Sequence, residues 1–542
     1  MSSLAQLAAA LGVIARLQGE GYQACLAGGC VRDLLLGRTP SDYDVATSAT
    51  PDRVLQIFPR CFAVGAHFGV VLVSCQLSAL SSQLSAHGAS TEGLSHAKQL
   101  AAPQVPPQPS AVSCQLSAHG ANTEGLSHAK QLAAPQVPKQ LVAPQVEVQV
   151  EVQVEVATFR SDGAYSDGRH PDAVRYTLSA AKDVQRRDFT INGLLFDPLR
   201  SLRGGGALDE ILADPEKLRA AVEDHVGGLA DLDAGLVRAI GDPARRFAED
   251  HLRMMRAVRF AARFGFALDP VTEAAIRQLA PRMASVSRER VRDELTKMLV
   301  EGQARRAFEL LDATGLLAEV LPEVARMKGV EQPPEYHPEG DVWQHTLGLL
   351  SQLEPGCAKT LAWAALLHDV GKPATFQRAA DRIRFSNHAE VGVAIAGEVC
   401  RRFRFANGET EQITALVAHH MRFMDALRMK ESTIKRFLRL DRFAEHLALH
   451  RMDCLASSGH LENWRFMQER WQSTPAESFR PAPLLTGHEL IAAGYRPGAH
   501  FRAMLEAAED AQLEGMIHTA EEALVLVRTR FGAPDARKEQ GC

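Results

Sequence analysis

The chain of 542 residues carries a formal net charge of −5 at pH 7, and 46% of its residues are hydrophobic, 6% aromatic and 23% charged. This length allows roughly three or more domains, each with its own core. No stretch is apolar for long enough to span a bilayer, so no membrane insertion is expected, and the overall charge gives no sign of nucleic-acid binding. Nine cysteines without Cys-x-x-Cys spacing predict reduced thiols in the cytoplasm, not a disulfide framework or a zinc-thiolate site.

The N-terminal segment, residues 1–17, is rich in alanine and leucine. Its single charge, Arg16, follows the apolar residues, whereas a signal peptide begins with basic residues. The segment therefore predicts an amphipathic helix.

Residues 28–44 read GGCVRDLLLGRTPSDYD and are the first that indicate chemistry. Gly28 and Gly29 allow the backbone to approach a triphosphate closely, and a helix expected at 31–36 presents its N-terminal amides to the same anion. Asp42 and Asp44 are expected on one face of a strand, where two carboxylates can share divalent cations. The motif predicts nucleotidyl transfer assisted by two metal ions, with a solvated surface pair as the alternative.

Residues 76–145 contain no Phe, Tyr or Trp and hold seven prolines, and the segment 83–106 recurs as 115–138 with a period of 32. Such a duplicated, polar sequence cannot bury an apolar face, so we expect a disordered insertion. Strand-like runs at 68–73 and 146–156 flank it, which places the insertion at the tip of a hairpin.

A third carboxylate is needed to complete a metal site, and Glu155 on the second of these strands is the best candidate. Valine alternates there with Glu or Gln, so one face of the strand is apolar and the other acidic. Glu147 and Glu151 share the acidic face, so the register stays open, and a solvated strand face is the alternative.

A second polar cluster, Arg186-Arg187-Asp188, is followed by Asn192. Guanidinium groups suit phosphate and ribose oxygens, although a structural ion pair between Arg187 and Asp188 is the alternative. The segment 160–176 is rich in Gly, Asp and Pro and predicts a mobile loop that could gate nucleotide access.

After Pro198 the pattern changes to helical periodicity, which continues to about Val527. Amphipathic helices are expected at 260–266 and 286–300, and residues 531–542 predict a frayed tail. The chain is therefore predicted to be mixed α/β first and all-α afterwards.

Seven arginines stand against three acids between residues 238 and 263, a local net charge of +4. Within this segment, Glu249-Asp250-His251-Leu252-Arg253 can discriminate bases. Cytosine and adenine both present an exocyclic amine beside an unprotonated ring nitrogen, so an Asp acceptor and an Arg donor match both without a template. The alternative is a helical i, i+4 ion pair between Glu249 and Arg253.

In the second half, His345, the doublet His368-Asp369 and Asp453 form an ordered histidine and carboxylate set. Such sets hold divalent metals and activate water for phosphate-ester hydrolysis, so we expect a divalent metal of unspecified identity there. Any single histidine would more often be structural, but the ordered set is more specific. Further candidate ligands are His388, His419 and His420.

The motifs at 28–33, 42–44, 155–160, 186–192 and 249–253 occur in the order found in class II tRNA nucleotidyltransferases, the family of CCA-adding enzymes and poly(A) polymerases. The chain resembles this family over nearly all of its length outside 76–145. The resemblance extends to Val286–Arg290, Leu485–Leu490 and the segment 494–498.

The resemblance implies an α+β protein with a polymerase-β-like head domain followed by all-α regions that hold the tRNA acceptor arm. The head spans 1–200, a helical neck and body 201–335, an HD domain 336–460 and a helical tail 461–542.

The resemblance also implies that Asp42 and Asp44 bind Mg²⁺ and that Glu155 assists. The tRNA 3′-hydroxyl would attack the α-phosphorus of CTP or ATP and release pyrophosphate without a template. The residues that the resemblance assigns to nucleotide binding are Gly28, Gly29, Arg32, Arg187, Asn192, Asp250, Arg253, Arg256 and Arg259.

Two departures from the family pattern are His251, where proline is usual, and the repeat insertion in place of a short hairpin loop. The intact segment 160–176 argues against a CC-adding relative, which lacks this loop. The alternatives are an A-adding enzyme, a poly(A) polymerase, or an HD phosphohydrolase with an RNA-binding head.

Overall fold

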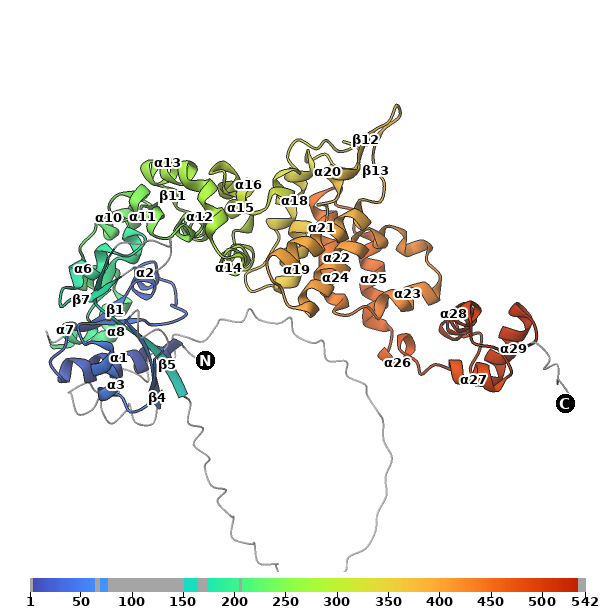
Figure 1. The fold of residues 1–542 in the computed structure, drawn as a ribbon, viewed down its shortest axis with the longest axis horizontal. Coiled ribbons are helices and arrows are strands. Elements are labelled where there is room, and N and C mark those ends of the chain that lie inside the picture. Colours follow the sequence, from blue (N-terminus) through green and yellow to red (C-terminus); the bar gives the residue numbers. More distant parts are fainter. Residues whose placement is uncertain (1–2, 64–68, 77–150, 164–172, 204–206, 535–542) are drawn as a thin grey trace, which may run out of the picture. The chain divides into compact units, whose positions relative to one another are not determined.

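The structure is a computed structural model that describes residues 3–63, 69–76, 151–163, 173–203 and 207–534. The chain folds as two compact units (Figure 1). The first comprises residues 1–162, 174–187 and 191–229, and the second comprises 163–173, 188–190 and 230–542.

The first unit is built on a seven-stranded sheet in the order β3-β4-β5-β2-β1-β8-β9. Only β2 and β5 run parallel, and the other neighbours are antiparallel. The strands are β1 Ala24–Ala27, β2 Val45–Thr47, β3 Cys61–Phe62, β4 Val70–Gln76, β5 Glu151–Thr158, β8 Leu194–Phe196 and β9 Val222–Asp224. The helices are α1 Ser3–Gly19, α2 Gly29–Leu35, α3 Pro51–Ile57, α6 Ala180–Gln185, α7 Pro198–Arg203, α8 Leu208–Ala213 and α9 Pro215–Ala221.

The predicted hairpin is confirmed, because β4 and β5 pair antiparallel from Val70 opposite Ala157 to Gln76 opposite Glu151. Along β5 the valines are buried and the Glu and Gln side chains exposed, as the alternation predicts. The disorder expected for 76–145 concerns, apart from Gln76, residues 77–145, which lie outside the described residues.

Two local predictions are wrong. Asp42 and Asp44 do not lie on a strand, because β2 begins only at Val45 and both aspartates precede it. The segment 160–176 is not entirely a loop: its ends, β6 Arg160–Asp162 and β7 Val174–Tyr176, pair antiparallel, since backbone bonding at both ends outweighs the turn-forming composition. Residues 164–172 between them lie outside the described part of the chain.

The second unit is mainly helical, as the periodicity after Pro198 predicts. The helix expected at 286–300 is confirmed as α14, and the one expected at 260–266 is the last part of α12, which begins at Leu252 and ends at Phe264. Gly265, at φ 73°, ends α12 in the left-handed conformation that glycine tolerates best. The elements up to residue 325 are α10 Gly228–Asp233, β10 Leu236–Val237, α11 Pro243–Glu249, α12 Leu252–Phe264, β11 Ala267–Leu268, α13 Pro270–Leu279, η3 Ala280–Ser285, α14 Arg288–Val300, α15 Ala304–Ala313, α16 Leu316–Val320 and α17 Pro322–Ala325.

Beyond residue 325, helices pack around Phe423, Phe437 and Phe443, and a separate apolar cluster runs from Leu485 to Val527. Within the described residues, none of the helices combines the length and apolar character that crossing a membrane requires. The elements are α18 Val342–Leu350, α19 Lys359–Leu367, α20 Lys372–Thr375, β12 Phe376–Arg378, β13 Ile383–Phe385, α21 His388–Arg402, α22 Asn407–His419, η4 His420–Arg428, α23 Glu431–Leu438, α24 Phe443–Ala456, α25 Glu462–Ser473, α26 Ala476–Phe479, α27 Gly487–Ala492, α28 Ala499–Leu513 and α29 Ala520–Phe531.

Candidate functional site

Three carboxylates gather where β2 and β5 run side by side in the first unit. Asp44 directly precedes Val45, which pairs with Val156 next to Glu155. Burial raises the pKa of Asp44 to about 7, and repulsion from Glu155 and Asp42 adds to the shift. Partial removal from water and the charge of Asp42 also raise the pKa of Glu155. Such crowding of like charges suits a divalent cation, which would neutralise it.

Glu151, the other candidate for the third carboxylate, lies four residues before Glu155 on the same face of β5. Glu151 is the first residue of β5, and its carboxylate accepts a hydrogen bond from the hydroxyl of Ser74 on the neighbouring strand β4. The electrostatic interactions that shift the pKa of Asp44 come from Glu155 and Asp42 instead. The geometry therefore groups Glu155, rather than Glu151, with the two aspartates.

Arg187 lies beside both the glycine motif and the carboxylates. A Cβ added to Gly28 would stand 2.9 Å from Arg187 Nη1, and the positive φ of 77° at Gly28 favours glycine as well. The positive charge of Arg187 opposes the pKa increase of Asp44. Asp183 accepts hydrogen bonds from Arg187 and from Arg186, and therefore fixes both guanidinium groups.

Asp183 was not identified from the sequence. It lies three residues before Arg186 and four before Arg187, a spacing that allows ion pairs along a helix. The structure does not show the alternative ion pair between Arg187 and Asp188. Arg187 pairs with Asp183 instead.

Arg32 and Asn192 are brought together although 160 positions separate them. Arg32 donates a hydrogen bond to the side-chain oxygen of Asn192. Its Nη2 atom also donates to Asp33 Oδ1, at 2.7 Å. Arg32 is only 4% exposed. This contact therefore holds α2 against the 186–192 motif.

In the second unit, the motif Glu249–Arg253 spans two helices rather than one. α11 ends at Glu249, Asp250 caps it, and α12 begins at Leu252. Asp250 Oδ2 accepts from Arg290 Nη2 at 2.7 Å. The alternative that Glu249 and Arg253 pair is what the structure shows, with Nη1 to Oε2 at 2.8 Å, although the two residues lie on consecutive helices.

Arg256 and Arg259 on α12 face different environments. Arg256 reaches Asp188 Oδ2 at 2.7 Å and therefore joins the helix to the polar cluster 68 residues earlier. Arg259 is 5% exposed and contacts Glu294 at 2.7 Å and Glu301 at 3.3 Å. These contacts tie α12 to α14.

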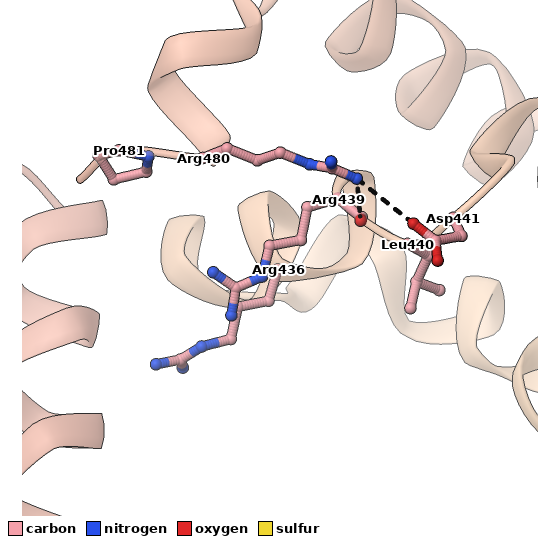
Figure 2. A pocket seen from close by; sticks show the side chains of 6 residues that line it. All are labelled: Arg436, Arg439, Leu440, Asp441, Arg480 and Pro481. Carbon is pink, nitrogen blue, oxygen red and sulfur yellow. Dashed lines mark hydrogen bonds and ion pairs between the residues drawn. The ribbon is translucent and has the colours of Figure 1, made fainter. Parts of the chain in front are cut away.

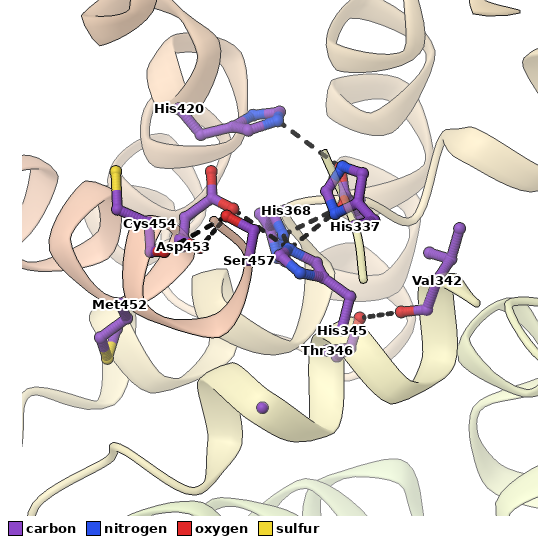
Figure 3. A network of polar contacts seen from close by, with 12 residues as sticks. His337, Val342, His345, Thr346, His368, His420, Met452, Asp453, Cys454 and Ser457 are labelled. Atoms are coloured by element: carbon purple, nitrogen blue, oxygen red, sulfur yellow. Dashed lines mark hydrogen bonds and ion pairs between the residues drawn. The ribbon is translucent and has the colours of Figure 1, made fainter. Parts of the chain in front are cut away.

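The sequence-predicted HD residues converge in the second unit (Figure 3). His345 Nε2 lies 3.1 Å from Asp453 Oδ1 and 3.3 Å from His368 Nε2. His388 and His420 place their Nε2 atoms 3.3 Å apart on the other side of Asp369. Asp369 Oδ2 is 3.2 Å from His368 Nε2, and Oδ1 is 3.6 Å from both His388 Nε2 and His420 Nε2.

All four histidines of this cluster are oriented in the same way. Each Nδ1 lies within hydrogen-bond distance of an oxygen that can only accept, so Nδ1 carries the proton and Nε2 keeps a free lone pair for a metal. The acceptors are Glu339 Oε1 for His345 (2.7 Å), the Ala365 carbonyl for His368 (3.0 Å), the Phe385 carbonyl for His388 (2.9 Å) and the Val417 carbonyl for His420 (2.7 Å).

The donor set therefore fits divalent metal ions. Burial alone would lower the pKa of His345, but its hydrogen bonds to Asp453 and Glu339 raise it to about 9, so a metal ion that binds Nε2 would have to displace a proton from that atom. His419 does not join the cluster, because its ring lies against His446 and Phe437. Among the described residues, the groups of three or more metal-ligand atoms that lie within 4.8 Å of one another are all in this region, so the oxygens of Asp42, Asp44 and Glu155 are spread more widely.

Four residues around the cluster were not identified from the sequence. Glu339 also contacts His337 Nδ1 at 2.9 Å. Lys372 Nζ bridges Asp369 Oδ2 and Gln332 Oε1, each at 2.7 Å. The sequence did give a signal for Lys372, because this residue directly follows His368-Asp369-Val-Gly. Gln332 and Glu339 come close to the cluster only when the chain folds.

A pocket of about 620 Å³ lies at the end of α23, lined by Arg436, Arg439, Leu440, Asp441, Arg480 and Pro481 (Figure 2). Its arginines are largely committed to the protein. Arg436 and Arg439 pair with Glu509, at 2.6 Å each, and Arg480 donates to the Arg439 carbonyl at 2.8 Å. We assign no ligand to it.

The first unit and the histidine cluster together define a class of protein: a nucleotidyltransferase head domain joined to a helical region with an HD domain. Comparison with family profiles agrees. Residues 24–88 and 127–238 match the poly A polymerase head domain, 265–328 the probable RNA and SrmB-binding site of polymerase A, and 342–453 the HD domain.

The chain belongs to the tRNA nucleotidyltransferase family. It is 33% identical over 366 residues to an A-adding tRNA nucleotidyltransferase of Deinococcus radiodurans, covering 64% of this chain and 78% of that enzyme. It is 34% identical over 372 residues to a CC-adding tRNA nucleotidyltransferase of Thermus thermophilus, covering 66% and 79%. Against a CCA-adding enzyme of Geobacillus stearothermophilus, identity is 34% over 309 residues, 57% of this chain and 53% of that enzyme.

The chain thus spans about half the length of the CCA-adding enzymes that it matches in sequence. A solved structure of the Bacillus stearothermophilus CCA-adding enzyme in complex with CTP has the same fold, with a TM-score of 0.61 at 23% identity over 96% of both chains. The predicted α+β fold is confirmed.

Proposed function

We propose that this protein adds C, C and A to tRNA 3′ ends from CTP and ATP, without a nucleic-acid template, and releases pyrophosphate. The observation that carries the proposal is the crowding of Asp42, Asp44 and Glu155 beside Arg187 and Gly28. The names of its relatives support the substrates, although they include CCA-, A- and CC-adding enzymes.

Asp42, Asp44 and Glu155 would hold Mg²⁺, which supplies electrostatic stabilisation of the reacting triphosphate when bound. Arg187 lies close enough to Asp44 to affect its pKa and would offset triphosphate charge in the same region. Gly28 leaves room for the phosphates because it has no side chain. Gly29, Arg32 and Asn192 belong to the same motifs, and the buried pair of Arg32 and Asn192 would position α2.

Asp250 and Arg253 would select the base by accepting from the exocyclic amine of C or A and donating to the neighbouring ring nitrogen. The contacts of Asp250 with Arg290 and of Arg253 with Glu249 would orient the two side chains. Arg256 and Arg259 complete the family's nucleotide-binding set, and the ion pairs of Arg259 favour a supporting role for it.

The test is extension of tRNA transcripts that end before the CCA, after one C or after CC, with Mg²⁺ and with CTP and ATP separately and together. Addition of two C residues and one A to the first transcript, lost in Asp42→Ala, is the expected result. Addition of A only, and only to the CC-ended transcript, would make the protein an A-adding enzyme. No extension of any transcript would overturn the proposal.

A second function is inferred for the HD region: metal-dependent hydrolysis of phosphate esters. The favouring observation is that the two oxygens of Asp369 face two histidine groups, His345 with His368 and His388 with His420. Each group would hold a divalent ion, and bound ions of this kind activate water and polarise a phosphate. Asp453 would complete the first group.

His368→Ala should abolish phosphate release without changing tRNA extension, and Asp42→Ala should do the reverse. His419→Gln is the matched control, because this neighbouring histidine faces His446 and Phe437 instead of the cluster. Bound metal, measured by mass spectrometry, should fall in His368→Ala and stay unchanged in the control. Phosphate release that survives His368→Ala would contradict the assignment.

A further inference from the structure

The β12–β13 hairpin grows directly out of the HD metal cluster. β12 follows α20, whose first residue, Lys372, contacts Asp369, and β13 is followed by α21, which begins at His388. The hairpin therefore joins the cluster at Lys372, which contacts Asp369, and at the proposed ligand His388, while the turn extends away from the helices (Figure 1). Neither the nucleotidyl transfer nor the metal set assigns a task to this hairpin.

The strand register divides the hairpin into two chemically distinct faces. Phe376 pairs with Phe385, and Arg378 pairs with Ile383, so these four residues share one face, here called the aromatic face. The opposite face carries the pair between Gln377 and Arg384.

The aromatic face adjoins the metal cluster. Lys372 Nζ lies 5.4 Å from the centre of the Phe385 ring and 2.7 Å from Asp369 Oδ2. The Phe376 ring is the next one outward, 6.0 Å from that of Phe385. A substrate whose phosphate lies beside Asp369 and Lys372 would therefore have its remaining part near these two rings.

The outer part of the aromatic face is open to solvent and basic. Phe376 is 36% exposed, and the Arg378 side chain is 65% exposed. Arg378 pairs with Glu331, which is itself 62% exposed, and such exposed ion pairs are weak enough for a phosphate to displace. The hairpin, residues 376–385, carries three arginines against one aspartate.

We propose that the aromatic face binds the base of a ribonucleoside phosphate whose phosphate group is hydrolysed at the HD cluster. Exposed aromatic rings beside arginine are the combination that proteins use to stack unpaired bases and to neutralise their phosphates. The inference rests on the proposed phosphohydrolase function. In the reaction, water breaks the phosphorus–oxygen bond, and the products are the nucleoside and inorganic phosphate.

The test compares two phosphomonoesters in the full-length protein loaded with Mn²⁺: adenosine 3′-phosphate and glycerol 2-phosphate, which has no base. Phe376→Leu keeps an apolar partner for Phe385 but removes the stacking ring. It should raise the KM for adenosine 3′-phosphate about tenfold, because stacking on one ring contributes that order of affinity. The KM for glycerol 2-phosphate should stay within about twofold, since no base is present to stack.

Two further variants separate recognition from damage to the hairpin. Arg378→Gln, on the aromatic face, should also raise the KM for adenosine 3′-phosphate. Arg384→Gln removes an equal charge from the opposite face and should leave it unchanged. Equal effects of Arg378→Gln and Arg384→Gln, or an unchanged KM in Phe376→Leu, would overturn the proposal.

Calorimetric binding of adenosine 3′-phosphate to the Mn²⁺-loaded variants keeps this result distinct from failure of the phosphohydrolase itself. If neither ester is hydrolysed but Phe376→Leu still weakens binding, the hydrolytic function fails and the base-binding surface stands. If binding is also unchanged, both fail. A tetranucleotide with a 3′-phosphate distinguishes the ligand's source: tighter binding than the mononucleotide indicates an RNA end, and equal or weaker binding a free nucleotide.

Discussion

Residues of one chemical type meet very different surroundings in this protein, and those surroundings suggest different roles. Glu155 and Glu151 project from the same strand, yet Glu155 interacts with Asp42 and Asp44 while Glu151 bonds to Ser74. Identity and spacing did not separate the two glutamates, because alternation places both on the acidic face.

We expect Glu155→Gln to slow addition of AMP to CC-ended tRNA at least about 100-fold, because loss of a metal-binding charge costs several kcal/mol of transition-state stabilisation. Glu151→Gln is the matched control and should stay within about twofold, since it removes only a contact remote from the reacting groups. Single-turnover kinetics at saturating ATP measure both rates. The opposite ranking of the two variants would identify Glu151 as the third carboxylate.

Arg259 should prove more important for stability than for nucleotide binding. Arg259→Met removes the closest partner of the buried Glu294 and leaves it Lys297, 3.5 Å away, and loss of such a buried partner typically costs about 3 to 5 kcal/mol. Arg263→Met removes a guanidinium 30% exposed and 3.4 Å from Glu301, and should cost less than about 1 kcal/mol. Thermal unfolding followed by circular dichroism gives both values. If Arg259→Met is as stable as the control but no longer binds nucleotide, the direct role stands.

At the scale of elements, helices in the HD region combine metal ligands with structural histidines. α24 contributes Asp453 to the cluster and also carries His446, which is 2% exposed. Burial, with a contribution from nearby His419, lowers the pKa of His446 to about 4. The folded helix therefore keeps this ring neutral, whereas the unfolded chain protonates it below its usual 6.5.

This difference predicts a pH dependence of stability. The unfolded state binds more protons between pH 6.5 and 4, so stability is complete above 6.5 and is lost as the pH falls toward 4. His446 should account for a loss of about 2 kcal/mol between pH 7 and 5. His446→Phe should remove that part of the loss, whereas His460→Phe, at a side chain 78% exposed, should not.

Urea unfolding followed by tryptophan fluorescence is suited to this measurement, because all four tryptophans lie between residues 343 and 471. The signal therefore reports on the region that contains α24. An equal loss of stability in the His446→Phe and wild-type proteins would show that this histidine is not the titrating group.

At the scale of the whole molecule, the first unit accommodates a long insertion without loss of its sheet. β4 and β5 keep a continuous register up to Gln76 opposite Glu151, the residues that flank the segment 77–150. Since closure entropy grows only slowly with loop length, the sheet need not change to tolerate it.

Replacing residues 77–150 with Asn-Gly should therefore preserve tRNA extension. Gln76 and Glu151 are directly opposite, which is the separation that a two-residue hairpin turn closes. The shorter loop should stabilise the first unit by about 2 to 3 kcal/mol. Circular dichroism melting and the extension assay test this. A soluble, folded deletion protein without activity would show that the insertion takes part in the reaction.

Much of this organisation was accessible from the sequence, because it depends on local patterns. Alternation in β5 set its buried face, helical periodicity after Pro198 indicated the mainly helical region, and the order of the motifs indicated the family. The histidine and carboxylate residues of the HD region were identified because each kind of side chain has a characteristic metal chemistry.

Contacts between residues distant in sequence were decided only by tertiary structure. The sequence could not join Arg32 to Asn192, Asp250 to Arg290, or Arg259 to Glu294. Spacing along one strand or helix is set by fixed backbone geometry and can be read from the sequence. Which charges face each other across elements depends on how the whole chain packs, and that packing also sets their burial and their pKa values.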